Sequence, residues 1–268
     1  MHRILLHVGP VTVYSYGFML ALAFIIGAIL AQARARRQNI SPDAIMDLVF
    51  AILVSSILGA RALYVAVNWR FYQAHPFDIV KVWEGGLVFY GGFILALCVA
   101  VWFMRARKLS FGTIADIMAP SVALGIALGR IGCFLNGCCY GTVSGRWGVA
   151  FPCRDGSPVC VQQAADGLIS LSARQSLPVL PTQLYSAFHA LLIFAALLAL
   201  ERYKKFDGFL FWLLALMYGA GRFFIEGFRY YEEAFMIGPL TISQAISAAL
   251  FGIAAAVLII RSKNAQRA

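Results

Sequence analysis

The chain has 268 residues, of which 61% are hydrophobic and only 13% are charged. Soluble domains carry about 25% charged residues, so this composition indicates an integral membrane protein and excludes an ordinary soluble enzyme. The formal net charge is +10. The sequence contains no basic stripe with interleaved aromatic residues, so we expect no nucleic-acid partner.

Seven apolar stretches are each long enough, at about 20 residues, to cross a bilayer as a helix. In chain order they cover residues 11–33, 44–67, 86–104, 113–133, 183–200, 208–225 and 241–260. The first stretch has no small-residue cleavage site before the arginines that follow it, so we expect it to be retained as a span. The sequence therefore predicts an all-α integral membrane protein with seven transmembrane helices.

Positive charges follow every odd-numbered span. The clusters are Arg34, Arg36 and Arg37; Arg105, Arg107 and Lys108; Arg202, Lys204 and Lys205; and Arg261, Lys263 and Arg267. Lys and Arg accumulate on the cytoplasmic side of membrane proteins. This alternation predicts an N-terminus outside and a C-terminus in the cytoplasm.

Two connections are longer than a simple helix turn. Residues 68–85 are rich in aromatic side chains, which is typical of a membrane interface. Residues 142–181 contain many Gly and Pro residues, and we expect them to form an irregular external, periplasmic-side cap between spans four and five. We expect residues 1–268 to form a single transmembrane domain.

The six cysteines fall in three places. Cys98 lies in span three, where we expect a small core residue. Cys133, Cys138 and Cys139 lie near the end of span four, and Cys153 and Cys160 lie in the cap. Because the external side is oxidising, a bridge from Cys138 or Cys139 to the cap is one possibility, but the sequence does not decide the pairing.

Four charged residues in or at the ends of the spans need an explanation: Arg61, Arg130, Arg222 and Glu226. An arginine at the centre of a bilayer costs at least about 2.5–3.5 kcal/mol. Such residues are expected to pair with another charge, line a cavity or bind a ligand.

Arg130 lies in the glycine-rich segment 129–141, which also contains Asn136 and Gly141. Four glycines there predict that span four breaks into a re-entrant turn, with Arg130 facing inward. The alternative is an arginine that snorkels at a helix end. The glycines and Asn136 favour a binding site.

Arg222, Glu226 and Arg229 are spaced i, i+4 and i+7, so they share one face of span six. One interpretation is a structural ion pair between helices. The other is an anion site, because a guanidinium binds phosphate through two parallel hydrogen bonds.

Weaker signals lie in the other spans. Tyr90 and Gly91 belong to a glycine-rich stretch that leaves room for a ligand or permits close helix packing. Tyr16 in span one and the segment 181–185 carry less information. His189 is expected to be a satisfied core residue. The histidines have no zinc-ligand spacing, and no metal or other cofactor is expected.

Taken together, these blocks resemble the prolipoprotein diacylglyceryl transferase family of bacterial inner-membrane enzymes. The matching segments occur in the same order along most of the chain: Tyr16-Gly17, Gly59-Ala60-Arg61, 83–92, 129–141, 181–185, 219–229 and Ser243-Gln244. The resemblance implies a multi-pass protein of the bacterial cytoplasmic (inner) membrane. It also implies transfer of the diacylglyceryl group from phosphatidylglycerol to the lipobox cysteine of preprolipoprotein signal peptides, with release of glycerol phosphate.

The resemblance also implies roles for individual residues. Arg130 and Arg222 match the two key arginines of the family, and Glu226 matches their acidic partner. The expected catalytic residues are Arg130, Arg222 and Tyr90. The residues expected to bind substrate are Arg130, Tyr16, Arg61, Gly91, Asn136, Gly141, Glu226 and Arg229. The expected partners are the two substrates and membrane lipid, and the expected oligomeric state is a monomer.

Three positions depart from the family pattern. Tyr90 stands where the family commonly has histidine, and Cys133 and Cys138 stand where it usually has asparagine and glutamate. Tyrosine, with a pKa of about 10, is a poorer base than histidine. The group that accepts the proton of the acceptor thiol could therefore be Tyr90, Glu226 or the leaving phosphate.

Two other classes of function compete with this interpretation. A transporter of lipids or anionic solutes would use the arginines to bind and release an anion without chemistry. An acyltransferase would instead use Cys133, Cys138 or Cys139 as a covalent nucleophile.

Overall fold

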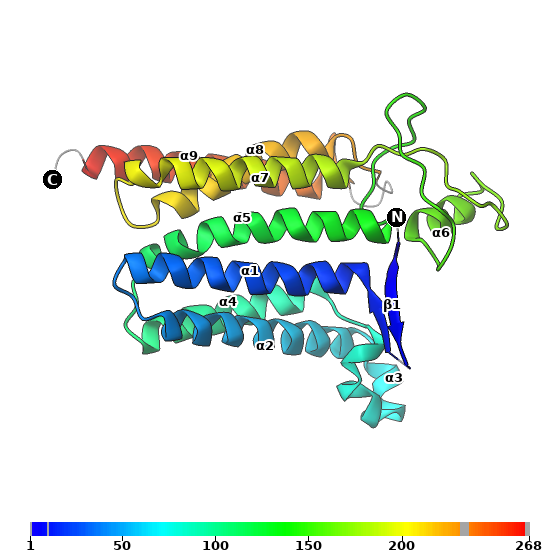
Figure 1. The fold of residues 1–268 in the computed structure, drawn as a ribbon, viewed down its shortest axis with the longest axis horizontal. Coiled ribbons are helices and arrows are strands. Elements are labelled where there is room, and N and C mark those ends of the chain that lie inside the picture. The colour runs from blue at the N-terminus through cyan, green and yellow to red at the C-terminus, as the bar shows by residue number, and fades with distance from the viewer. Residues whose placement is uncertain (1, 10, 231–235, 266–268) are drawn as a thin grey trace. The chain divides into compact units, whose positions relative to one another are not determined.

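A computed structural model describes residues 2–9, 11–230 and 236–265, and these residues are mainly helical (Figure 1). The chain divides into two compact units. The first unit comprises Met1–Ile29 and Ala115–Ala268, and the second unit comprises Leu30–Ile114. The expectation of a single transmembrane domain stays a prediction.

Seven helices in the described part of the chain are long and apolar enough to cross a membrane. They are Ser15–Arg37 (α1), Pro42–Val67 (α2), Phe89–Ala106 (α4), Phe111–Asn136 (α5), Thr182–Tyr203 (α7 with a short 3-10 turn), Phe209–Glu226 (α8) and Ile242–Ala265 (α9). The seven predicted spans are confirmed, with ends that shift by a few residues.

The N-terminal part of the first predicted span is not helical. Strand β1 (Ile4–Val8) pairs antiparallel with strand β2 (Val11–Tyr14), and helix α1 begins only at Ser15. The residues of β2 are β-branched or aromatic, types that favour strands over helices. The prediction that the span begins at residue 11 was therefore wrong.

Span four does not break where its glycines suggested. Helix α5 continues through Gly129 and Gly132 and ends at Asn136. Gly132 instead permits close packing, since a Cβ there would lie 3.1 Å from Cβ of Met19. The chain turns after the helix, where Gly137 has φ +75° and Cys139 has φ +60°. The helix thus ends within segment 129–141, as predicted, but the chain turns at Gly137 rather than at Gly129 or Gly132.

The core of the first unit joins α5, α7 and α8. Its buried residues are Ala119, Ala123, Ile193, Leu197, Leu210 and Leu214. The fully buried Asp116 of α5 accepts hydrogen bonds from the backbone N–H groups of Gly208 (2.8 Å) and Phe211 (3.1 Å) at the start of α8. Lys204 binds the same carboxylate at 3.1 Å. These contacts fix the start of α8 against α5, and hence the position of its other end, which carries Arg222 and Glu226.

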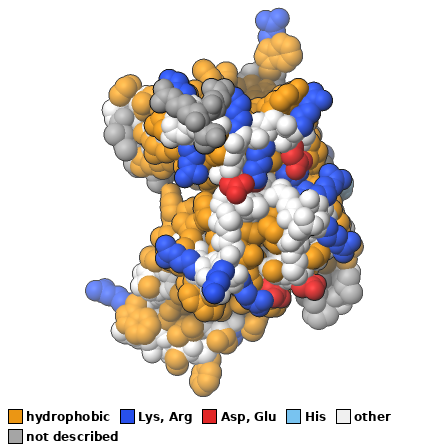
Figure 2. Space-filling model, turned by 90° about the vertical axis from the view of Figure 1, so that its left-hand side faces the viewer, with side chains coloured by type: hydrophobic (Ala, Val, Ile, Leu, Met, Phe, Trp, Pro, Cys, Tyr) orange, Lys and Arg blue, Asp and Glu red, His pale blue; other side chains and the backbone are white. Residues whose placement is uncertain are grey.

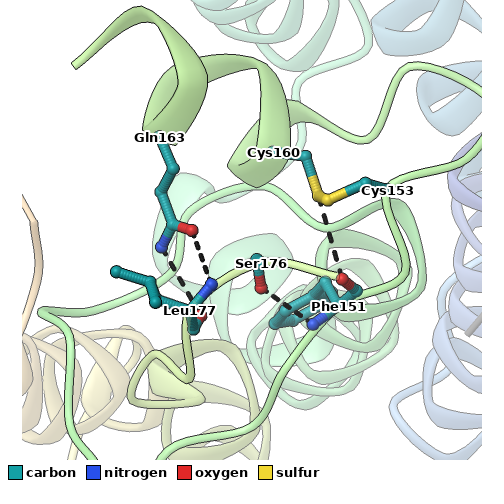
Figure 3. Close-up of a disulfide and its surroundings, with 6 residues drawn as sticks. All are labelled: Phe151, Cys153, Cys160, Gln163, Ser176 and Leu177. Carbon is teal, nitrogen blue, oxygen red and sulfur yellow. Dashed lines mark hydrogen bonds between the residues drawn. A yellow bond between two sulfur atoms is a disulfide. The ribbon is translucent and has the colours of Figure 1, made fainter. Parts of the chain in front are cut away.

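The cap folds around a small core of its own. A short helix, α6 (Pro158–Ala165), and the buried side chains of Phe151, Val159 and Val179 form its centre. As Figure 3 shows, the Gln163 amide binds both the N–H of Leu177 (2.8 Å) and its carbonyl (3.5 Å). Isolated β-bridges, such as Val149–Val179, join the remaining loops. The predicted irregular character of this segment agrees with the structure.

The cap also contains a disulfide bond between Cys153 and Cys160 (Figure 3). The possible bridge from Cys138 or Cys139 to the cap is therefore wrong. The two bonded cysteines lie only seven positions apart in the sequence, and the packing of α6 on Phe151 brings them together. Cys133, Cys138 and Cys139 remain free thiols.

In the second unit, α2 and α4 pack through glycines. A Cβ on Gly59 would lie 2.4 Å from the carbonyl oxygen of Gly91, and a Cβ on Gly91 would lie 2.3 Å from that of Gly59. The aromatic-rich connection folds into α3 (Trp69–Ala74) and two 3-10 turns, Pro76–Val80 and Val82–Glu84. Cys98 of α4 is exposed, so its predicted place in the core is wrong.

Positive side chains lie at the C-terminal ends of α7 and α9 in the first unit. These ends lie at the left of Figure 1, and Figure 2, viewed from that side, shows many Lys and Arg side chains on this face. Arg202, Lys205, Arg261 and Lys263 are exposed there. In the first unit, strands β3 (Met236–Ile237) and β4 (Leu240–Thr241) precede α9.

Candidate phosphate-binding site

Arg130 of α5 and Arg222 of α8 line the same pocket in the first unit. Ser186, His189, Tyr218 and Ile225 complete its lining. The charge of Arg130 thus lies beside the hydroxyl group of Tyr218. The space within the pocket is about 10 Å³, close to what one water molecule needs. The structure thus brings together the two arginines that the sequence singled out, in a pocket that must widen to admit a lipid headgroup.

Glu226 is the fully buried partner of two arginines. Its Oε2 lies 2.6 Å from Nη2 of Arg222 and 3.5 Å from Nη1 of Arg229. The side chains of Arg222 and Arg229 are only 13% and 14% exposed. Arg222 lies one helical turn before Glu226, and Arg229 lies after the helix end, in the bridge with Gly141. The carboxylate therefore orients both guanidinia and offsets part of their charge.

The turn after α5 is held by the first residues of α7. Gln183 donates a hydrogen bond from Nε2 to the carbonyl of Cys138 at 2.7 Å, and Thr182 donates from Oγ1 to the carbonyl of Cys139 at 3.0 Å. Both side chains are buried. The segment 181–185, which carried little information as sequence, therefore fixes the backbone that follows Arg130.

Gly141 lies where three backbone segments meet. Its N–H donates to the carbonyl of Leu180 at 2.9 Å, and Gly141 forms an antiparallel bridge with Arg229. A Cβ at this position would lie 2.4 Å from the carbonyl oxygen of Phe228. Glycine is thus required by close approach, and the bridge ties Arg229 to the turn.

The three free thiols of the turn lie together. The Sγ atoms of Cys133, Cys138 and Cys139 are all within 4.8 Å of one another, and each side chain is half-buried. Hydrogen bonds from Cys133 and Cys138, with the nearby charges of Arg229 and Arg130, lower the pKa of Cys139 below the ordinary thiol range, although burial acts in the opposite direction.

Tyr16 and Asn136 border this thiol cluster. Tyr16 packs against Gly132, where a Cβ would lie 3.3 Å from its ring, and 41% of Tyr16 remains exposed. Asn136 is the last residue of α5 and lies two positions before Cys138. Both residues lie beside the segment that carries Arg130, and their predicted role in substrate binding stays a prediction.

Arg61 lies in the second unit and is buried. Its guanidinium donates to the backbone carbonyls of Asp78, Ile79 (2.9 Å), Gly85 (2.7 Å) and Gly86 (3.2 Å). It also lies over the rings of Tyr64 and Tyr72, at 5.6 and 5.4 Å from their centroids. With four bonds to carbonyls, this arginine holds the connection between α2 and α4 in place.

Tyr90 and Gly91 lie at the start of α4 in the second unit. Tyr90 is 65% exposed and its ring lies against Phe89, with centroids 6.0 Å apart. Gly91 contacts the backbone of α2, as the close-packing alternative predicts. Because these residues and Arg130 belong to different units, the predicted roles of Tyr90 and Arg61 near the phosphate stay predictions.

Several residues of the site were missed or undervalued from the sequence. His189 was expected to be an ordinary core residue, but it lines the pocket, and Gly221 makes room for it, since a Cβ there would lie 2.1 Å from the imidazole. Tyr218 was not singled out. Its position four residues before Arg222, one helical turn away, was the available signal.

Two guanidinia that line one small pocket form an arrangement that can bind an anion. Phosphate accepts paired hydrogen bonds from guanidinium groups, and low solvent exposure strengthens such interactions. His189, Ser186 and Tyr218 add further polar groups around the same space. Seven apolar helices and this pocket together define a multi-pass membrane protein with a site suited to an anionic headgroup.

The comparisons with known proteins identify the family. The family model for prolipoprotein diacylglyceryl transferase matches residues 3–260, so the chain belongs to this family. It is 35% identical to the phosphatidylglycerol–prolipoprotein diacylglyceryl transferase of Geobacillus kaustophilus, over 97% of this chain and 93% of that protein. It is 36% identical to the Thermosynechococcus vestitus enzyme of the same name, with 90% and 86% covered, and 34% identical to that of Bacillus cereus, with 99% and 94% covered.

Proposed function

We propose that this chain transfers the diacylglyceryl group of phosphatidylglycerol to prolipoproteins, the first step of bacterial lipoprotein maturation. The family and the names of its relatives support this reaction. The structural observation that carries the proposal is the shared pocket of Arg130 and Arg222. Phosphatidylglycerol is anionic through its phosphate, the group that paired guanidinia bind best.

In the proposed reaction, the acceptor is the thiol of the lipobox cysteine. Its sulfur attacks the glycerol carbon of the diacylglyceryl group, a carbon–sulfur bond forms, and the carbon–oxygen bond to phosphate breaks. Glycerol phosphate leaves with the bonding electrons. Arg130 and Arg222 stabilise the charge that develops on its bridging oxygen, and such fixed donors commonly contribute about 10²–10³ in rate.

Glu226 has an orienting role in this proposal. Its carboxylate is bound by Arg222 and Arg229 on one oxygen, and this engagement makes it a weaker candidate for the base that accepts the thiol proton. Tyr90 and the leaving phosphate are the other candidates. Once it carries the additional charge, the phosphate can accept the proton without a further protein group.

The location and orientation follow the sequence expectations. We place the protein in the bacterial inner membrane as a monomer, with the N-terminus and the cap outside. The exposed Arg202, Lys205, Arg261 and Lys263 at the ends of α7 and α9 support a cytoplasmic location for these ends. The acceptor cysteine then reaches the site from the external side.

A transfer assay tests the proposal. Purified protein is incubated with phosphatidylglycerol and a lipobox peptide, and mass spectrometry detects a diacylglyceryl thioether on the peptide. We expect the adduct with the unchanged protein and with Arg146→Ala, an exposed arginine of the cap. We expect none above background with Arg130→Ala or Arg222→Ala. Lipid binding without any adduct, where a relative is active, would instead support a transporter.

A further inference from the structure

The strongest feature that the proposed reaction does not use is the thiol cluster, defined as Cys133, Cys138 and Cys139. We propose that these three thiols bind one thiophilic metal ion, Zn²⁺ or Cu⁺, at the C-terminal end of α5. Such ions prefer soft sulfur ligands, and a site of three cysteines offers them no competing oxygen. This inference is independent of the proposed transfer reaction.

The spacing of the sulfur atoms suits an ion at their centre. With zinc–sulfur bonds of about 2.3 Å, sulfur atoms around one ion lie about 3.8–4.0 Å apart. The three Sγ atoms here are within 4.8 Å of one another. Small side-chain rotations are enough to close that difference, because Cys138 and Cys139 lie in a turn rather than in a helix.

The backbone of the turn brings the third thiol to the other two. Cys139 has φ +60°, a left-handed conformation that is unfavourable for residues other than glycine. Strained conformations of this kind are typical of functional sites. The hydrogen bonds from Thr182 and Gln183 to the carbonyls of Cys139 and Cys138 hold the strained backbone.

The surroundings of the cluster suit an anionic metal–thiolate group. Zn²⁺ with three thiolates has a net charge of −1, and Cu⁺ with three thiolates has −2. Arg130 and Arg229 lie close enough to Cys139 to interact with its charge. The Sγ of Cys138 lies 3.7 Å from the carbonyl oxygen of Cys133, within the same turn.

The composition of the cluster limits the kind of site. Among the described residues, the group of nearby ligands contains only these three cysteines. A tetrahedral ion would thus keep one position for water or an added ligand. A bound ion would tie the last turn of α5 to the turn that follows it, and so would fix the backbone beside Arg130.

Metal binding can be measured directly on the full chain in detergent. The background variant Cys98→Ser removes the exposed free cysteine of α4. After reduction and chelator treatment, the protein is dialysed against Zn²⁺. The amount of bound zinc per chain is then measured by elemental mass spectrometry. We expect about one ion per chain, and addition of Co²⁺ should give the charge-transfer absorption of thiolate ligands. Cys139→Ser should weaken binding by about tenfold or more.

A second measurement uses no substitution of the three proposed metal ligands, so that misfolding of a variant does not affect the result. In the chain without any substitution, which retains Cys98, Zn²⁺ should slow alkylation of Cys133, Cys138 and Cys139, while the alkylation rate of Cys98 stays the same. Absence of bound metal together with unprotected thiols would overturn the proposal. A disulfide between two of the three cysteines, with no metal bound after its reduction, would overturn it as well and would point to a redox pair.

Discussion

The carboxylate of Glu226 binds Arg222 at 2.6 Å while its side chain is fully excluded from solvent. A buried charge without its partner is far more costly than an exposed one, because no water replaces the lost interaction. The pair also sets the direction of a guanidinium in the proposed phosphate pocket. Stability and function therefore depend on the same contact.

Glu226→Gln keeps the size of the side chain and removes its charge. We expect a loss of about 3–5 kcal/mol in the free energy of unfolding, since Arg222 and Arg229 would then face each other without a carboxylate. Unfolding in one detergent measures this. The matched control is Asp47→Asn, because Asp47 binds Arg107 at 3.3 Å with both side chains more than half exposed, and we expect about 0–1 kcal/mol there. Equal effects would contradict the buried pair.

Arg130→Lys and Arg222→Lys keep the positive charge but remove the planar group that forms paired hydrogen bonds. We expect each to lower the transfer rate by about 10²–10³ while the protein stays folded. The initial rate of thioether formation measures this. Arg146→Lys on the exposed cap serves as the control. A lysine variant with full activity would show that charge alone is sufficient.

Gly91→Ala tests the contact between α2 and α4. The new Cβ would lie 2.3 Å from the carbonyl oxygen of Gly59, so the helices must separate, and we expect a loss of about 1–3 kcal/mol. Gly252→Ala in α9 is the matched control, because nothing lies within 4 Å of its added Cβ. In a helix that change should stabilise by about 0.5–1 kcal/mol. Thermal unfolding of both variants compares them, and unchanged stability of Gly91→Ala would refute the close contact.

The alkylation rate of Cys139 should depend weakly on pH in the metal-free, reduced protein. Its pKa is lowered by hydrogen bonds from Cys133 and Cys138 and by Arg229 and Arg130, so the reactive thiolate persists as the pH falls. Between pH ~8.5 and ~6.5 an ordinary cysteine slows roughly 50-fold, as its pKa of about 8.5 dictates. We expect less than about fivefold for Cys139, followed by mass spectrometry of the labelled peptide. A fall equal to that of a free cysteine peptide would contradict the lowered pKa.

The sequence predicted the spans well because their apolar stretches are long and end in charge clusters. It also singled out Arg130, Arg222 and Glu226, since charged groups in apolar helices are costly unless they serve a purpose. The structure confirms that these three residues lie together at the ends of α5 and α8.

Features that depend on packing between distant segments were not predictable. Helix α5 tolerates Gly132 because Tyr16 and Met19 pack against it. Helix propensities of the neighbouring residues do not predict this packing. The Cys153–Cys160 bond depends on how α6 packs in the cap. Gln183 holds the turn after α5 through a hydrogen bond to the carbonyl of Cys138, which lies 45 positions earlier in the sequence. No local pattern indicates a contact over that distance.

The most direct test counts both products of the reaction in one sample. The unchanged protein is incubated with phosphatidylglycerol and a lipobox peptide, and glycerol phosphate and the diacylglyceryl thioether are both quantified over time. We expect equal molar amounts of the two products, and neither product when the acceptor cysteine is replaced by serine. Binding or movement of lipid with no glycerol phosphate released, under conditions where a related enzyme turns over, would contradict it.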